Sequence, residues 1–165
     1  MATIVVTGGT FFKIYDPKTE KFVLCDRKNV KDILDSVTCQ FTHKPQICIW
    51  DLKDSEEITD DDREKLLTTC LGIGNQVVVI HGTTTLHKTQ QFFLNKFDLT
   101  CQKKIIITGA FIPASCKGSD APFNLGFALG ALASVTPGIY VAMNGRIYTK
   151  QVRKDVNRSL FETDI

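Results

Sequence analysis

The sequence predicts a three-layer α/β fold, with a mainly parallel sheet of the Rossmann-like or flavodoxin-like kind covered by helices on both faces. Short apolar runs rich in Val and Ile alternate along the chain with segments of helical periodicity, which is the pattern of βαβ units. Such nearly continuous apolar runs are typical of parallel strands buried on both sides. The chain has 165 residues, of which 43% are hydrophobic and 23% charged, so we expect one globular domain comprising residues 1–165.

Five apolar runs are the predicted parallel strands, and most of them end at a turn signal. They cover residues 3–6, 47–50, 76–80, 104–107 and 139–143. Asn144-Gly145 is a strong hairpin signal, so residues 146–148 are expected to return as an antiparallel strand. Residues 11–21 are expected to form a mobile loop or a loose hairpin, with residues 22–24 as its return.

Four segments carry apolar residues at helical spacing. They cover residues 29–37, 59–70, 86–97 and 123–135. Asn29 is the expected N-cap of the first, and Thr59 followed by three aspartates is a strong start for the second. The second should stop at Gly72 or Gly74. The fourth is apolar or small nearly all round, which predicts a helix that is buried or lies in an interface.

Composition and motifs argue against several functional classes. The net charge of +2, with basic residues scattered among acidic ones, gives no reason to expect nucleic acid or membrane binding. The six cysteines show neither a C-x-x-C pair nor metal-ligand spacing, and no leader segment is apparent, so we expect reduced thiols in a cytoplasmic protein. His81 and His87 are expected to be structural rather than metal ligands, and no phosphate-binding glycine motif is present, so no metal or cofactor is expected.

Three of the predicted strands end in turns rich in threonine and glycine. These turns are Thr7-Gly8-Gly9-Thr10, His81-Gly82-Thr83-Thr84-Thr85 and Thr108-Gly109-Ala110. Because parallel strands point the same way, the three turns should lie at one edge of the sheet, where ligands bind in open α/β folds. The alternative is that each is an ordinary turn whose threonines bond to their own backbone.

Six motifs, in this order, resemble the amino-terminal domain of the bacterial-type L-asparaginase family. They are TGGT (7–10), DSEEIT (54–59), HGTTTL (81–86), TGAFIP (108–113), SDAPFNL (119–125) and YVAMNGRIYTKQVRK (140–154). The resemblance covers nearly the whole chain and implies the fold of that domain. The carboxy-terminal domain of the family has no counterpart in it, so the chain is similar to short, single-domain relatives.

The resemblance implies roles for individual residues. Thr10 matches the nucleophilic threonine, Thr83 the second essential threonine, and Lys154 the lysine that activates it. Tyr15 is the candidate for the loop tyrosine that assists the nucleophile. A threonine hydroxyl is a poor nucleophile at pH 7 and needs such a base or proton relay. Without the resemblance, Lys154 would be assigned to a solvated charged tail.

Other residues are implied in substrate binding. Ser55 matches the ligand of the substrate carboxylate, and Glu56 occupies the neighbouring substrate-contacting position. Backbone amides at Gly9, Gly82 or the helix that follows are candidates to stabilise an oxyanion.

Thr84 departs from the family pattern, because the family has an aspartate directly after the second threonine. A neutral hydroxyl cannot replace that charge, so a carboxylate from Asp54, Glu56, Glu57 or Asp120 would have to do so. Two functions therefore remain open. One is an amidohydrolase that cleaves the side-chain amide of L-asparagine or a related small molecule through a threonine acyl-enzyme. The other is a catalytically impaired module that binds an amino acid or dicarboxylate. In both cases the apolar segment 123–135 predicts a homodimer or a higher homo-oligomer.

Overall fold

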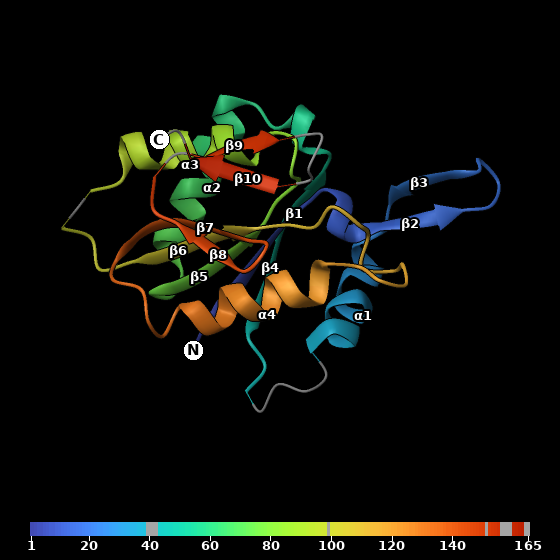
Figure 1. The fold of residues 1–165 in the computed structure, drawn as a ribbon, viewed down its shortest axis with the longest axis horizontal. Coiled ribbons are helices and arrows are strands. Elements are labelled where there is room, and N and C mark those ends of the chain that lie inside the picture. The colour runs from blue at the N-terminus through green and yellow to red at the C-terminus, as the bar shows by residue number, and fades with distance from the viewer. Residues whose placement is uncertain (39–42, 99, 151, 156–159, 164–165) are drawn as a thin grey trace.

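The computed structural model describes residues 1–38, 43–98, 100–150, 152–155 and 160–163, and it centres on a six-stranded sheet (Figure 1). The sheet order is β4-β1-β5-β6-β7-β8. These strands are β1 (Thr3–Gly8), β4 (Gln46–Lys53), β5 (Gln76–Ile80), β6 (Lys104–Thr108), β7 (Gly138–Met143) and β8 (Arg146–Tyr148). The first five pair in parallel and β8 is antiparallel to β7, so the parallel strands have the flavodoxin-like order 2-1-3-4-5. The predicted fold class is confirmed.

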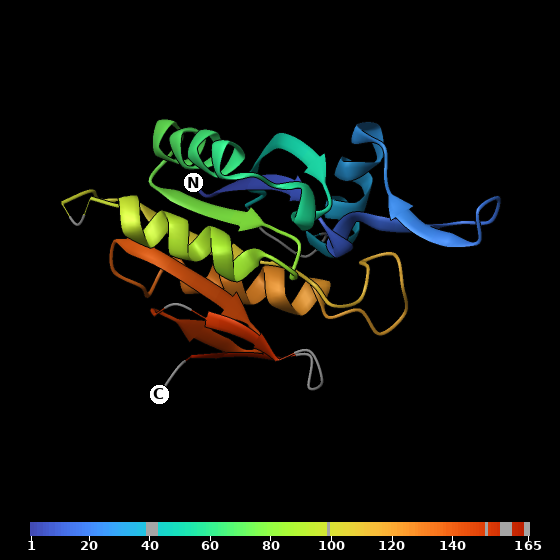
Figure 2. The same cartoon turned by 90° about the horizontal axis from the view of Figure 1, so that it is seen from above.

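Helices cover both faces of the sheet, as Figures 1 and 2 show. The helices α1 (Arg27–Thr38) and α4 (Ala121–Ala131) pack on one face, and α2 (Asp60–Gly72) and α3 (Leu86–Lys96) on the other. In β1, Ile4 and Val6 belong to the first core and Val5 to the second, and all three side chains are fully buried. Burial on both faces explains why the strand sequences are apolar without alternation.

After β1 and after β5 the chain continues toward opposite edges of the sheet. From β1 it passes to β4 on one side, and from β5 it passes to β6 on the other. Loops that diverge in this way leave a crevice at the carboxyl ends of the two strands, which is the usual ligand position in such sheets.

Two hairpins lie outside the main sheet. One consists of β2 (Lys13–Asp16) and β3 (Lys21–Leu24) and projects from the body of the protein in both views. The other consists of β9 (Val152–Asp155) and β10 (Leu160–Thr163). Gln90 of α3 fixes this second hairpin, because its amide group donates to Lys150 O (2.9 Å) and accepts from Val152 N (2.9 Å). Lys154 therefore lies on a strand of this hairpin and not on a solvated tail.

Several predicted boundaries need correction. Asn29 lies inside α1 instead of capping it, because the first turn already begins upstream, with Asn29 N donating to Asp26 O at 2.9 Å. The last helix begins at Ala121, where Pro122 occupies its first turn, and ends at Ala131 instead of Val135.

Other local predictions are confirmed. Thr59 caps α2, which ends at Gly72. Asn144 and Gly145 have φ values of 53° and 73°, as a tight hairpin turn between β7 and β8 requires. Of the two alternatives for residues 11–21, a loop or a hairpin, the hairpin is present over residues 13–24, whereas Phe11 and Phe12 belong to a 3-10 turn. Within the described ranges, no helix combines the length and the apolar character needed to cross a membrane.

Candidate active site

The turns that follow β1 and β5 touch through their glycines. Gly9 has φ 75°, and a Cβ atom there would lie 2.4 Å from the Cα of Gly82. A Cβ atom on Gly82 would in turn lie 2.7 Å from the Cβ of Ser55. Only glycine permits such close packing of the backbone. Thr10 and Thr83 directly follow these two glycines, so the predicted convergence of the turns brings both residues to one edge of the sheet.

The two threonines of the first turn have different environments. Thr7 is fully buried, and its hydroxyl donates to Ile80 O at 3.0 Å, so it links β1 to β5. Thr10 is partly exposed at the start of the 3-10 turn η1 (Thr10–Phe12). Within the described part of the chain, no hydrogen bond occupies the Thr10 hydroxyl. The alternative of a purely structural turn thus describes Thr7 but not Thr10.

Thr83 and Lys154 are in direct contact. Lys154 Nζ donates to Thr83 Oγ1 at 3.2 Å, although 71 residues separate them in the sequence. The Thr83 side chain is buried and Lys154 is half-buried. Loss of solvent lowers the pKa of Lys154 below its ordinary value, and the negative charge of Glu56 acts in the opposite direction. A lysine amine with a lowered pKa is a candidate general base.

Ser55 lies beside this pair, at the start of the 3-10 turn η2 (Ser55–Glu57). Its side chain is 4% exposed, and its Oγ accepts from Thr85 N at 3.3 Å. The Thr85 hydroxyl donates to Ser55 O at 2.6 Å, which links the end of β4 to the start of α3. Among the described residues, no acceptor takes the Ser55 hydroxyl proton, so that proton is available for a ligand carboxylate.

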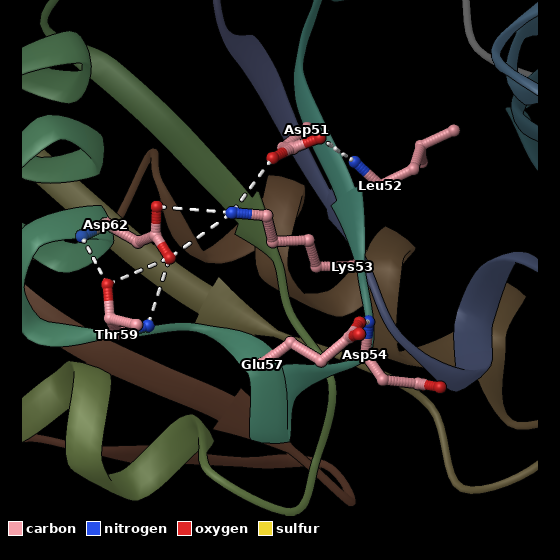
Figure 3. Close-up of polar contacts among 7 residues, drawn as sticks. All are labelled: Asp51, Leu52, Lys53, Asp54, Glu57, Thr59 and Asp62. Atoms are coloured by element: carbon pink, nitrogen blue, oxygen red, sulfur yellow. Dashed lines mark hydrogen bonds and ion pairs between the residues drawn. The ribbon is translucent and has the colours of Figure 1, made fainter.

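A network of charges fixes the segment that carries Ser55 (Figure 3). Lys53 Nζ contacts Asp62 at 3.2 Å and Asp51 at 3.3 Å, and the hydrogen bond to Asp62 raises the pKa of Lys53. Thr59 Oγ1 accepts from Asp62 N at 3.2 Å, and the Asp62 carboxylate accepts from Thr59 N at 3.0 Å. The end of β4 is thus held against the beginning of α2.

Three of the four carboxylates considered as substitutes for the family aspartate already have partners. Asp54 forms an ion pair with Lys13 at 2.8 Å, and Glu57 accepts from Asp54 N at 3.0 Å, as Figure 3 shows for Asp54 and Glu57. Asp120 accepts three backbone hydrogen bonds, two from Phe111 N and one from Ile112 N.

Glu56 differs from those three. Its side chain is exposed, and its charge acts on Lys154. No hydrogen bond or ion pair of Glu56 is present in the described residues. Of the four carboxylates, it is therefore the one free to act at the site.

A buried network behind Thr83 was not evident from the sequence. Arg63 Nε donates to Thr89 Oγ1 at 3.1 Å, so the Thr89 hydroxyl can donate to His81 Nε2 at 2.9 Å. This assigns the proton of the neutral imidazole to Nδ1, which donates to Gly82 O at 2.9 Å. Because the peptide group is planar and trans, this bond turns the Thr83 N–H toward the opposite side.

The same network confirms the structural role predicted for His81. Its imidazole is fully buried, and burial lowers its pKa to about 4. Within the described residues, no group of three or more histidine, cysteine or acidic side chains is arranged to hold a metal ion.

Tyr15 and Thr84 are not part of this cluster. Tyr15 is 55% exposed on the projecting hairpin and packs edge-on against Phe22, with ring centroids 5.7 Å apart. In the described part of the chain, no hydrogen bond, ion pair or ring contact joins it to Thr10, Thr83 or Lys154. Thr84 is exposed next to Thr83.

Comparison with known proteins identifies the family to which this chain belongs. Residues 2–162 match the family model described as asparaginase, N-terminal. The chain belongs to the asparaginase family. The resemblance carried by the six sequence motifs is thereby confirmed.

Curated relatives in the asparaginase family are longer than this chain. It is 29% identical to L-asparaginase 2 of Escherichia coli (strain K12) over 171 residues, which cover 93% of this chain and 47% of that protein. It is 39% identical to the glutaminase-asparaginase of Acinetobacter glutaminasificans over 88 residues, which cover 50% of this chain and 26% of that protein. The chain spans less than half the length of either relative.

Solved asparaginase structures share the fold. L-asparaginase I from Vibrio cholerae O1 biovar eltor str. N16961 gives a TM-score of 0.83 at 23% identity, covering 98% of this chain and 50% of that one. The probable cytoplasmic L-asparaginase from Campylobacter jejuni gives a TM-score of 0.74 at 20% identity, covering 93% and 47%. This chain therefore has the architecture of about one half of an asparaginase.

Proposed function

We propose that the protein is an asparaginase-like amidohydrolase, which cleaves the side-chain amide of L-asparagine or a related small molecule through a threonine acyl-enzyme. The hydrogen bond between Lys154 and Thr83 is the main support for this proposal. It pairs a hydroxyl with an amine of lowered pKa, next to the glycine contact that brings Thr10 to the same edge of the sheet.

In this mechanism the Thr10 hydroxyl attacks the amide carbon. A bond forms between Thr10 Oγ1 and that carbon, and the negative charge that develops on the amide oxygen is stabilised by backbone N–H groups at Gly9 and Gly82. The C–N bond then breaks, and the proton lost by the hydroxyl leaves with the nitrogen as ammonia. Water hydrolyses the resulting ester and regenerates Thr10.

Thr83 and Lys154 handle protons in this scheme. The lysine, as a neutral amine, accepts a proton through the Thr83 hydroxyl and returns it to the leaving group. Tyr15 is proposed to assist Thr10, which requires the projecting β2–β3 hairpin to bring this exposed residue toward the site.

Substrate binding is assigned to the segment after β4. The free proton of the Ser55 hydroxyl suits a substrate carboxylate. Glu56 supplies the negative charge that the family takes from the aspartate at the position of Thr84, and this charge acts on Lys154 and would attract a substrate ammonium. Its charge acting on Lys154 supports this assignment.

Ammonia release tests the proposal. The purified protein should release ammonia from L-asparagine or another amide in a panel of small amides, and T10A and T83A should each lower the rate by at least 100-fold. T100A, in an exposed loop, should keep the wild-type rate. If the wild-type protein at high concentration releases no ammonia from any amide, the proposed activity is wrong.

A second candidate is a module that binds an amino acid or dicarboxylate without hydrolysis. The neutral, exposed Thr84 in place of the family aspartate favours it. In that case aspartate should raise the thermal midpoint of the protein without turnover. The substitution Thr84→Asp distinguishes the two candidates, because a gain of hydrolysis indicates an otherwise complete site.

We also propose that the protein acts in the cytoplasm as a homodimer or higher homo-oligomer. The cysteines at 25, 48, 70, 101 and 116 are free thiols, as expected in a reducing compartment, whereas Cys39 lies outside the described residues. The apolar surface of α4 supports self-association.

A further inference from the structure

Lys154 contacts an aromatic ring as well as a hydroxyl. Its Nζ lies 5.3 Å from the centroid of the Phe111 ring, over the ring face. The same Nζ donates to Thr83 Oγ1 at 3.2 Å. A cation over an aromatic face at this distance is attracted by the ring quadrupole. Among the described residues, a neutral hydroxyl and an aromatic ring thus hold the ammonium of Lys154.

Phe111 is held in place at its backbone and at its ring. The Phe111 backbone N–H donates to both carboxylate oxygens of Asp120, at 3.1 and 3.0 Å, which anchors the loop after β6. Its ring packs against Phe161, with centroids 5.9 Å apart. Phe161 is fully buried and is the cross-strand partner of Lys154 in the β9–β10 hairpin. Side chains of such partners lie on the same face, so Phe111 contacts both members of the pair.

We propose that Phe111 is a positioning residue for Lys154, with its ring face holding the ammonium within reach of the Thr83 hydroxyl. A four-carbon lysine side chain has many conformations, and only a few of them bring Nζ to Thr83. The ring and its Asp120 anchor select those conformations before substrate binds. The catalytic consequence rests on the proposed hydrolase function, but the positioning itself does not.

Two charged or titratable groups on neighbouring elements interact with Lys154. Glu56 of η2 favours the charged amine of Lys154. The pKa of His87 of α3 is lowered mainly by burial, and the charge of Lys154 adds a smaller effect in the same direction. The ring adds to the effect of Glu56, because it too stabilises the ammonium, while it also excludes water. Truncation of the ring would lower the pKa of Lys154 by removing the attraction to the ammonium and raise it by admitting water. A change of the ring's electron density alters only the attraction.

Site-specific replacement of Phe111 with 3,4,5-trifluorophenylalanine tests the proposal. Fluorine withdraws electron density from the ring face with little change of shape, so the variant should fold. NMR titration of the Lys154 side chain should then give a pKa lower than in the wild-type protein by roughly half a unit, because a weaker ring face stabilises the ammonium less. F111W should keep the pKa of Lys154 at or above its wild-type value, since the indole ring binds cations best. The same fluorinated residue at Phe161, which touches Phe111, is the control and should leave the titration unchanged.

An unchanged Lys154 titration on fluorination at Phe111 would overturn the proposal, as would an equal change on fluorination at Phe161. The measurement needs no turnover. If no amide is hydrolysed but fluorination lowers the pKa, the proposed activity fails while the role of Phe111 stands. If the protein is active, the fluorinated variant should also shift the pH profile of kcat downward, which a merely structural role would not do.

Discussion

At the level of single residues, the buried His81 orients the peptide that carries Thr83. Its imidazole is neutral, with a pKa of about 4 in the folded protein against an ordinary value of 6.5. Between these values the unfolded chain binds more protons than the folded one. The contribution of neutral His81 to the free energy of unfolding is therefore fully present above pH 6.5. This contribution decreases as the pH falls toward 4, by about 3 kcal/mol in total.

Urea unfolding at a series of pH values measures this dependence. H81Q should be less stable at pH 7 and should lose most of the slope between pH 6.5 and 4. The exposed His43 offers a matched control, because H43N should keep the wild-type slope. A full slope in H81Q would contradict the assignment.

Glu56 should control the pH dependence of hydrolysis. Burial lowers the pKa of Lys154 below its ordinary value of 10.5, and a neutral amine is needed for proton transfer. The value of kcat/KM should therefore rise with pH as Lys154 deprotonates. Glu56 opposes the effect of burial, so E56Q should move the midpoint of this rise to lower pH.

The neighbouring Glu57 provides the comparison for E56Q. Its carboxylate accepts from Asp54 N, a bond that the glutamine in E57Q can retain. E57Q should therefore move the midpoint less than E56Q does. A midpoint that moves upward in E56Q would contradict the proposed electrostatic role of Glu56.

At the level of elements, local signals predicted most of the strands and helices. Ile4, Val5 and Val6 are buried on both faces of the sheet, and this burial appears in the sequence as a continuous apolar run. Asn144-Gly145 specifies its own turn. The predicted N-cap at Asn29 is wrong, because the turn starts at Asp26. The hydrogen bond that begins this turn joins two backbone atoms, Asn29 N and Asp26 O, and leaves no side-chain signal in the sequence.

The capping box of α2 is a local signal whose contribution can be measured. Thr59 and Asp62 each accept a hydrogen bond from the backbone N–H of the other (Figure 3). T59A should lower the free energy of unfolding by about 1 kcal/mol, because the Asp62 N–H loses its acceptor, the Thr59 hydroxyl. Thr68 lies exposed in the middle of the same helix, so T68A should change stability by less than about 0.5 kcal/mol. Chemical denaturation of both variants provides the measurement, and equal losses would contradict the capping role.

At the level of the whole molecule, the parallel topology made half of the site predictable. Strand direction alone places Gly9, Gly82 and Gly109 at one edge of the sheet. The position of Lys154 could not be derived in this way, because it depends on Gln90 holding the β9–β10 hairpin more than 60 residues away in the sequence. The bond pattern of His81, Thr89 and Arg63 is equally non-local. Only the family resemblance pointed to Lys154 before the structure did.

The outer face of α4 supports the proposed self-association of the whole molecule. Phe123 is 60% exposed and stacks on Phe127, with centroids 6.1 Å apart and ring planes at 2°. Beside them runs an apolar groove of about 560 Å³, which includes Val135 and Ile147 in its lining. No charged residue occurs between positions 121 and 135. Two copies can therefore bring this face together around a two-fold axis without like-charge repulsion.

The proposed self-association through the α4 face predicts the effect of a single charge placed on it. F123E would set two like charges against each other in an apolar contact, so sedimentation velocity should show a shift from dimer or higher oligomer to monomer at micromolar concentration. Leu71 is the control, because it is 39% exposed on α2, a helix of the opposite face. L71E should leave the oligomeric state unchanged. If F123E sediments like the wild-type protein, the contact between copies lies elsewhere than on α4.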